Sequence, residues 1–264
     1  MRKNNINFLY SIVLSTYQSD LYLNDALESL YNQSFQNYEL VLINDNSSDN
    51  TEKILKYWKD KFNNFVYIKN SKNLGLTKSL NIGISKSKGK YIVRHDSDDI
   101  SHPSRMAIQD LFFKAYPKTN LLFAEEIHLN KKGNVIKVSF INNIIRKIKR
   151  LFIFRNLWLY NSVAHGTSSF QRKNNSKLIL YNESYKKSQD FELWSRLILL
   201  TKLKTKFILI PLYFLRIHEK SISHKYKDEQ NYFRNKIFQR NLKTNFNSIK
   251  NKINRIFLII KHSK

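Results

Sequence analysis

The first hundred residues alternate short apolar runs with stretches in which apolar side chains recur at helical spacing. The apolar runs, typical of buried strands, cover residues 10–16, 39–43, 65–68 and 90–95. The helical spacing covers residues 19–33, 50–61 and 77–87. Strands that alternate with helices in this way predict a parallel sheet with right-handed crossovers.

The remainder of the chain continues this pattern less regularly. Pro103 predicts the start of a helix that runs to residue 115. Further strands are predicted at residues 120–124 and 207–217, a hairpin at 127–138 around the turn 131–134, a helix at 189–200 and a cationic helical tail from about residue 225.

Polar side chains follow the ends of the first four predicted strands. They are Thr16 and Tyr17, Asp45, Asn73, and Asp96. Because ligands bind beyond the carboxyl ends of the strands in such sheets, these residues predict one binding site.

The run from Asp96 to Asp99 places three carboxylates directly after an apolar strand. In a strand-like segment, residues i and i+2 point the same way, so Asp96 and Asp98 would converge on one point. Mg²⁺ and Mn²⁺ prefer oxygen ligands and often bridge a carboxylate to phosphates. The alternative is a solvated loop that begins a helix, with Asp99 or Ser101 as its cap.

Composition and charge narrow the classes of function. The net charge is +26, of which residues 1–110 carry +2 and residues 111–264 carry +24. Such a field favours a polyanionic partner: nucleic acid, an anionic membrane or a phosphorylated substrate. The absence of cysteine excludes a disulfide framework, cysteine metal sites and cysteine nucleophiles. Residues 1–5 lead into no signal-type cleavage site, and the apolar run 207–215 is shorter than the ~20 residues that span a bilayer.

Six ordered motifs, at residues 11–17, 39–49, 73–83, 96–99, 189–194 and 216–223, resemble the family 2 inverting glycosyltransferases. The resemblance covers roughly residues 9–224 and implies the α/β GT-A fold. In that fold a Rossmann-like, mostly parallel sheet is flanked by helices and accompanied by a small mixed sheet. It also implies a domain of residues 1–224, with a nucleotide-binding half (1–110) and an acceptor-binding half (111–224), followed by a basic amphipathic tail (225–264).

On the donor side, the resemblance implies that Asp45 reads the uracil ring of a UDP-sugar. The alternative for Asp45 is a helix cap, and the family's first acid at this point is Asn44 here. Asn73 and Lys78 fall where the family contacts nucleotide and phosphates, and Thr16 and Tyr17 join them as donor-binding residues. Lys78 fits a solvated helix face equally well.

Three further residues are implied at the metal and diphosphate. Asp96 resembles the first acid of the family's Asp-x-Asp motif, near ribose and metal, and Asp98 resembles the second, a direct ligand of Mn²⁺ or Mg²⁺. His218 resembles a late histidine that completes the metal or diphosphate site in parts of the family. A surface position at a strand end is its alternative.

On the acceptor side, Asp190 resembles the catalytic base, with capping of the helix that follows as its alternative. His165, Glu192 and Trp194 fall where the family lines the acceptor. For Trp194, a place in the core is the more common role.

The resemblance implies a single-displacement, metal-dependent transfer of a hexose or N-acetylhexosamine from a UDP-sugar. The acceptor is a glycan or lipid-linked hydroxyl in surface polysaccharide or lipopolysaccharide synthesis. Residues 141–155 and 249–264 combine cations with apolar residues and favour contact with anionic lipid. A cytoplasmic location, peripheral on the inner face of the membrane, follows. The alternatives are a nucleic-acid-binding protein, for which we find no sequence signature, and an inactive nucleotide-sugar-binding relative.

Overall fold

The computed structural model describes residues 9–137, 157, 161–201, 203–219, 221 and 226–262, and only the backbone of residues 200 and 246–262. Within these residues, an eight-stranded sheet has the order β3-β2-β1-β4-β7-β6-β10-β5. The strands are β1 (Tyr10–Thr16), β2 (Tyr38–Asn44), β3 (Phe65–Lys69), β4 (Tyr91–Asp96), β5 (Ile100–Ser101), β6 (Leu121–Leu129), β7 (Ser169–Gln171) and β10 (Thr205–Arg216).

Most of the pairing in the sheet is parallel. β3, β2, β1 and β4 pair in parallel, and so do β6 and β10. The short strand β7 joins the two groups by antiparallel pairing with β4 and β6, and β5 pairs antiparallel with β10. The carboxyl ends of β1, β2 and β4 therefore meet at one edge.

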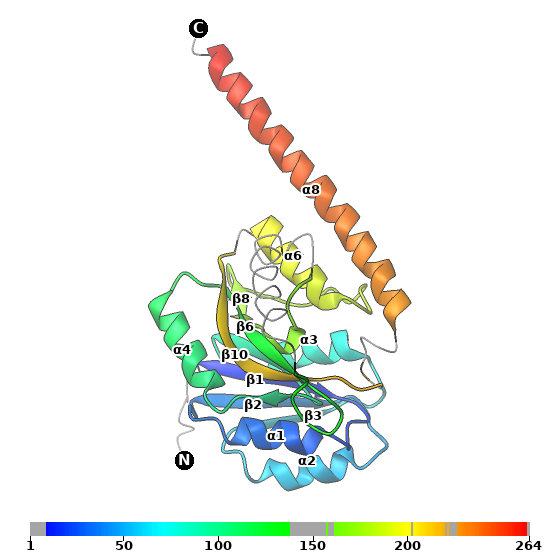
Figure 1. Ribbon diagram of the computed structural model, residues 1–264. Helices are drawn as coiled ribbons and strands as arrows, with labels where there is room; N and C mark the ends of the chain where they lie inside the picture. Colours follow the sequence, from blue (N-terminus) through cyan, green and yellow to red (C-terminus); the bar gives the residue numbers. More distant parts are fainter. Residues whose placement is uncertain are drawn as a thin grey trace.

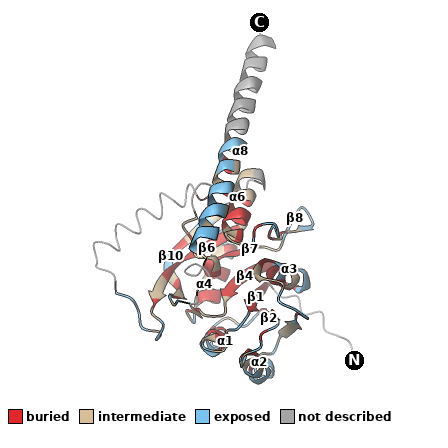
Figure 2. Ribbon diagram, turned by 90° about the vertical axis from the view of Figure 1, so that its right-hand side faces the viewer, coloured by how far each residue is buried: buried red, intermediate tan, exposed pale blue. Residues whose placement is uncertain are grey.

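Helices cover both faces of the sheet (Figure 1). They are α1 (Leu23–Tyr31), α2 (Thr51–Lys59), α3 (Leu76–Lys86), α4 (Arg105–Ala115) and α6 (Gln189–Thr201), and the last helix of the chain is α8 (Lys227–His262). One core cluster joins the sheet to α1, α2 and α4, and a second joins it to α3 and α6. The burial pattern in Figure 2 follows these two layers, with the strands buried.

The predicted elements are confirmed where the pattern was regular, and three details differ. The strand predicted at residues 207–217 is β10, which covers Thr205–Arg216 and carries register shifts between Ile208 and Tyr213. β6 extends to Leu129, beyond the predicted end at residue 124. The hairpin exists as a bridge between Leu129 and Val135 around the predicted turn, and residue 138 lies outside the described residues.

The smaller sheet is a two-stranded antiparallel pair, β8 (Lys173–Asn174) with β9 (Lys177–Leu178). The predicted helical tail is confirmed as α8, which has 36 residues. Ile237 packs near Phe191 and Tyr185, Arg240 binds Glu192 of α6, and the later part of α8 rises away from the domain (Figure 1). Residues 141–155 lie outside the described residues. In the described part, no helix has the length and apolar character to cross a membrane.

Candidate functional site

Side-chain hydrogen bonds tie together the loops that follow β1, β2 and β4. The backbone N–H of Gln18 donates to Ser47 Oγ (3.1 Å), and the hydroxyls of Ser19 and Ser97 lie 2.9 Å apart. Gln18 adopts a left-handed conformation with φ 51°, which turns the chain sharply after β1. The loops that follow β1, β2 and β4 thus lie against one another at the carboxyl edge of the sheet.

Asp45 is buried at the end of β2 and accepts three hydrogen bonds. Its Oδ1 accepts from Asn70 Nδ2 (2.7 Å) and Leu74 N (2.8 Å), and its Oδ2 accepts from Gly75 N (2.8 Å). Asp45 therefore fixes the loop that precedes α3. At the start of α2, whose N-cap residue is Asn50, Asp49 Oδ1 accepts from the backbone N–H of Thr51 (3.1 Å).

The other predicted donor-binding residues surround this loop with different exposure. Tyr17 is half exposed, and Asn73 and Lys78 are exposed. Thr16 is almost fully buried, and its hydroxyl has no hydrogen-bond partner among the described residues. Contact of these four residues with a nucleotide stays a prediction.

Asp96 ends β4 and pairs with the guanidinium of Arg94, which is fully buried. Arg94 also donates to the carbonyls of Val13 and His95, both at 2.7 Å. Burial would by itself raise the pKa of Asp96, but the charge of the Arg94 guanidinium holds it below its usual value. The Asp96 carboxylate is therefore an oriented anion, positioned by a cation that the sequence analysis did not identify.

Asp98 lies in a turn, because β4 ends at Asp96 and residues 97–98 leave the strand. The argument from strand alternation therefore does not apply to Asp98, and the convergence of the two carboxylates stays a prediction. Asp98 instead meets His218, with Oδ2 and Nε2 2.9 Å apart. The sequence analysis named both residues as metal ligands.

The Asp98 and His218 pair offers one oxygen and one nitrogen that could bind a divalent cation such as Mn²⁺ or Mg²⁺. Both side chains retain some exposure, 30% for Asp98 and 9% for His218. In the described part of the chain, no group of three or more histidine, aspartate or glutamate side chains could hold a metal. Two protein ligands leave the other coordination positions to phosphates or water.

Two more residues complete the turn after β4. Asp99 is buried and accepts from the backbone N–H of Arg216 (2.7 Å), and burial with Asp98 and Asp96 nearby raises its pKa well above its ordinary value. His95, the residue before Asp96 in β4, is also buried, and burial lowers its pKa to about 3.

Asp190 lies in the first turn of α6, where its Oδ2 accepts from Asn161 Nδ2 (2.7 Å). The carboxylate is only partly buried. It is close enough to His165 and Tyr181 for its charge to raise the pKa of both side chains.

His165 belongs to the short helix η1 (His165–Thr167) and links Asp190 to the donor side. Its Nε2 accepts from Arg94 Nε (3.2 Å) and lies 2.7 Å from the hydroxyl of Tyr181. Burial and the charge of Arg94 lower the pKa of His165 to about 4. A neutral imidazole thus connects the region of Asp190 to Arg94 and Asp96.

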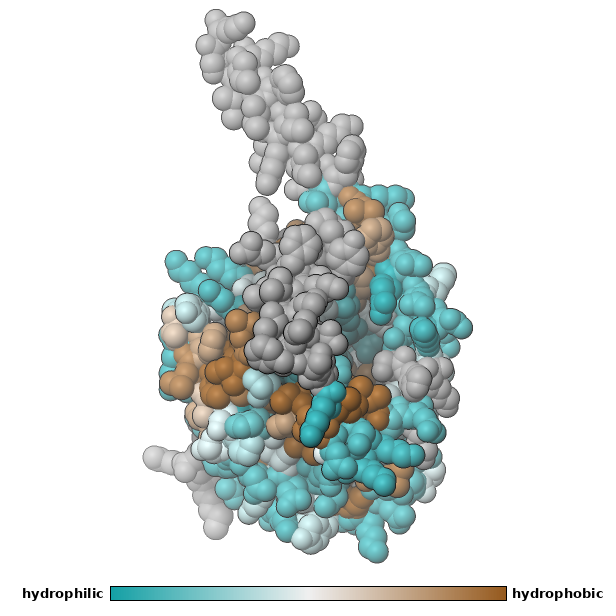
Figure 3. Space-filling model, in the orientation of Figure 1, coloured by the Kyte–Doolittle hydropathy of each residue, from teal (hydrophilic) through white to brown (hydrophobic). Residues whose placement is uncertain are grey.

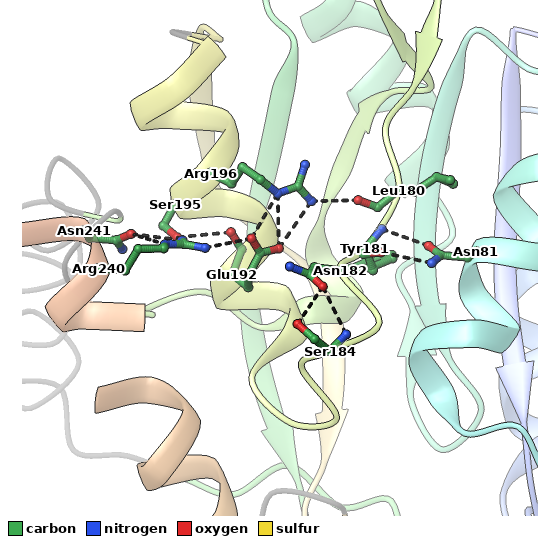
Figure 4. Close-up of polar contacts among 10 residues, drawn as sticks. All are labelled: Asn81, Leu180, Tyr181, Asn182, Ser184, Glu192, Ser195, Arg196, Arg240 and Asn241. Atoms are coloured by element: carbon green, nitrogen blue, oxygen red, sulfur yellow. Dashed lines mark hydrogen bonds and ion pairs between the residues drawn. The ribbon is translucent and has the colours of Figure 1, made fainter. Parts of the chain in front are cut away.

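Glu192 and Trp194 have partners inside the protein. The carboxylate of Glu192 is fully buried and binds Arg196 (3.0 Å) and Arg240 of α8 (2.9 Å), as Figure 4 shows. Trp194 is fully buried against Phe123 and Phe170. Their predicted place on the acceptor side stays a prediction, and their observed contacts join α6 to α8 and to the sheet.

The profile of "Glycosyl transferase family 2" matches residues 11–177, which is more than half of the chain. The chain belongs to this family. The match contains Asp45, Asp96, Asp98 and His165, and it ends before Asp190 and His218.

Relatives and solved structures agree with this family. The Bacillus subtilis minor teichoic acid biosynthesis protein GgaB is 28% identical over 259 residues, which cover 92% of this chain and 27% of GgaB. The chain spans 64% of another curated relative, a glycosyltransferase of Methanocaldococcus jannaschii that is 28% identical over 72% of this chain.

Two solved structures share the fold at low identity. Staphylococcus aureus TarS in complex with UDP-GlcNAc superposes with a TM-score of 0.61 at 19% identity, over 80% of this chain and 59% of that one. The mannosyltransferase PcManGT of Pyrobaculum calidifontis, in complex with GDP-Man and Mn²⁺, gives 0.62 at 16% identity, over 84% and 60%. The fold is therefore GT-A, as predicted.

Proposed function

We propose that this chain is an inverting glycosyltransferase that moves a hexose or N-acetylhexosamine from a UDP-sugar to a hydroxyl of a glycan or lipid-linked acceptor. One observation carries the proposal: direct contacts run from Asp96 through Arg94 to His165, which lies beside Asp190. The carboxylate proposed for the donor, Asp96, and the carboxylate proposed for the acceptor, Asp190, thus both lie close enough to His165 for their charges to act on it. Residues 1–110 form the donor half in this proposal, and residues 111–224 form the acceptor half.

On the donor side, the proposed role of Asp45 is to accept the imide N–H of uracil while it holds the loop before α3. A carboxylate that already accepts from Leu74 N and Gly75 N is fixed in orientation, so that little order is lost when a base binds. Asn73 and Lys78, exposed near this loop, are proposed to contact nucleotide and phosphates. Asp96, oriented by Arg94, is proposed to contact the ribose.

Asp98 and His218 are the proposed ligands of Mn²⁺ or Mg²⁺. When bound there, the cation supplies neutralisation of the negative charge that develops on the leaving diphosphate. Asp98 Oδ2 and His218 Nε2 lie 2.9 Å apart, close enough for one cation to bind both atoms.

Asp190 is the proposed base. It accepts the proton of the acceptor hydroxyl while that oxygen bonds to the anomeric carbon and the bond from this carbon to the diphosphate oxygen breaks. Attack opposite the leaving group inverts the configuration, so that an α-linked donor gives a β-linked product. The hydrogen bond from Asn161 fixes one oxygen of Asp190 and leaves the other for the acceptor.

The uridine nucleotide is a proposal supported by the TarS complex with UDP-GlcNAc, whereas PcManGT is in complex with GDP-Man. The relative GgaB, a teichoic acid biosynthesis protein, supports a polymer of the cell surface as the product class. Neither comparison exceeds 30% identity, so that the donor and acceptor must be found by assay.

The test is release of UDP or GDP from a panel of nucleotide-sugars with Mn²⁺, with and without a bacterial lipid extract as acceptor. We expect one donor to react in the wild type and Asp190→Asn to lose about 10²–10⁴-fold in kcat while still binding the nucleotide. Asp60→Asn, at an exposed aspartate after α2, is the matched control and should keep full activity. An Asp190→Asn variant with normal turnover would remove the base from this mechanism.

We also propose that the chain acts at an anionic membrane surface on the cytoplasmic side, with residues 225–264 as a basic amphipathic tail. Support comes from the net charge of +24 in residues 111–264 and from exposed apolar side chains on α4 and β10, namely Leu111, Leu209 and Ile210. Figure 3 shows a hydrophobic area on the side of the molecule where these elements lie. Lys206 sits 4.3 Å from the ring of Tyr116 nearby.

Sedimentation with lipid vesicles tests this location. We expect binding to phosphatidylglycerol vesicles that falls steeply with salt, and little binding to phosphatidylcholine vesicles. Equal binding to both lipids, or to neither, would contradict the proposal without affecting the proposed transfer reaction.

A further inference from the structure

Three contacts join the segment from Arg216 to His218, at the end of β10, to the turn that contains Asp98. Arg216 N donates to Asp99 Oδ1 (2.7 Å), Arg216 Nε donates to the carbonyl of Asp98 (2.9 Å), and His218 Nε2 meets Asp98 Oδ2 (2.9 Å). The Asp98–His218 pair therefore exists only while the segment from Arg216 to His218 keeps its place.

Residues at the start of α1 contact the segment from Arg216 to His218. The ring of Tyr22, which is the residue before α1, lies 4.5 Å from the guanidinium carbon of Arg216 and 4.8 Å from the ring of His218. Within the first turn of α1, Asp25 Oδ2 accepts from Arg216 Nη2 (2.8 Å). One aromatic ring thus contacts both side chains that hold Asp98.

These contacts restrict side chains that would otherwise rotate. The Arg216 side chain is 2% exposed, so its guanidinium needs the partners it has. They are Asp25, the Tyr22 ring and the carbonyls of Asp98 and Lys131. An imidazole that lies against an aromatic ring is limited to a few orientations, and ligand orientation sets metal affinity. Removal of such outer partners typically weakens metal binding about 10–100-fold.

We propose that Tyr22 and Asp25 are positioning residues for the cation site, acting through Arg216 and His218. Neither side chain is a ligand in this proposal. The ring of Tyr22 holds the imidazole of His218 toward Asp98, and Asp25 anchors the guanidinium that fixes the Asp98 carbonyl. The inference rests on the proposed function, because it needs a cation at Asp98 and His218.

Mn²⁺ binding in the presence of saturating UDP, measured from the electron paramagnetic resonance signal of free Mn²⁺, tests this role without activity. Tyr22→Leu removes the ring and is expected to weaken Mn²⁺ binding about 10-fold or more. Tyr22→Phe keeps the ring and is expected to bind as the wild type does. Tyr31→Leu, at the exposed tyrosine that ends the same helix, is the matched control and should leave Mn²⁺ binding unchanged.

The outcomes separate the inference from the proposed function. Thermal unfolding and UDP binding without Mn²⁺ identify any variant that has merely lost its fold. A folded Tyr22→Leu variant with wild-type Mn²⁺ affinity overturns the positioning role and leaves the cation site intact. A wild-type chain that takes up no Mn²⁺ overturns the cation site and the inference with it. Equal loss in Tyr22→Leu and Tyr22→Phe also overturns it, because the ring would then not be the cause.

Discussion

Replacing Arg94 with methionine removes the cation at the centre of the polar cluster. Arg94 is fully buried and makes hydrogen bonds to Asp96, His165 and two backbone carbonyls. Methionine fills similar volume and makes none of these bonds. The Asp96 carboxylate would lose its cation, and the carbonyls of Val13 and His95 would each lose a buried donor.

The magnitude follows from these losses. Removal of one partner from a buried ion pair costs about 3–5 kcal/mol. For a chain of 264 residues, an unfolding entropy of about 2.1 cal/mol/K per residue converts 4 kcal/mol into a fall in Tm of about 7 °C. The pKa of His165, lowered to about 4 by burial and by the charge of Arg94, should rise because the second cause is gone.

Thermal unfolding by calorimetry and titration of the His165 ring by NMR measure the two effects. Arg94→Lys is the matched control: it keeps the charge with fewer donors, so that it should lose less stability and leave the pKa of His165 low. If Arg94→Met lowers Tm by less than 2 °C and leaves the pKa of His165 unchanged, the reasoning is refuted.

Three further predictions concern other parts of the molecule. Glu192→Gln leaves Arg240 without a buried carboxylate, and we expect faster amide hydrogen exchange in α8, measured by mass spectrometry, with the domain still folded. Gly89→Ala places a Cβ 2.6 Å from the backbone nitrogen of Ser11, so denaturant unfolding should show a loss of stability of about 1–3 kcal/mol or more. Because the folded pKa of His165 is about 4 and the unfolded value is near 6.5, the unfolded state binds one more proton between these values. Stability should therefore fall as pH drops from about 6.5 to 4, by about 3 kcal/mol at most, and His165→Gln should remove this part of the slope.

Much of the sheet could be predicted because its strands and helices carry regular apolar spacing. β1 and α4 end where the sequence indicated, and the other regular elements end within a few residues of the predicted bounds. β7 and β5 were missed, because strands of three and two residues have no period to detect. Their existence depends on pairing partners that are far away in the chain, which no local pattern reveals.

The residues of the candidate site also fall into two groups, those that the sequence predicted and those that it missed. The sequence pointed to Asp98 and His218, and the structure brings these two side chains together across 120 positions. It did not point to Arg94 or Arg216, because a cation in a strand is read as solvent-facing unless its burial is known. The convergence of Asp96 and Asp98 was argued from strand alternation, which fails because the strand stops at Asp96.

Binding of UDP measured by isothermal titration calorimetry, with and without Mn²⁺, tests the central claim most directly. The site predicts that Mn²⁺ tightens UDP binding in the wild type, and that Asp98→Ala still binds UDP but loses this enhancement. GDP under the same conditions should bind more weakly. A folded wild-type chain whose UDP affinity does not change with Mn²⁺, or an Asp98→Ala variant that keeps the full enhancement, would contradict the account.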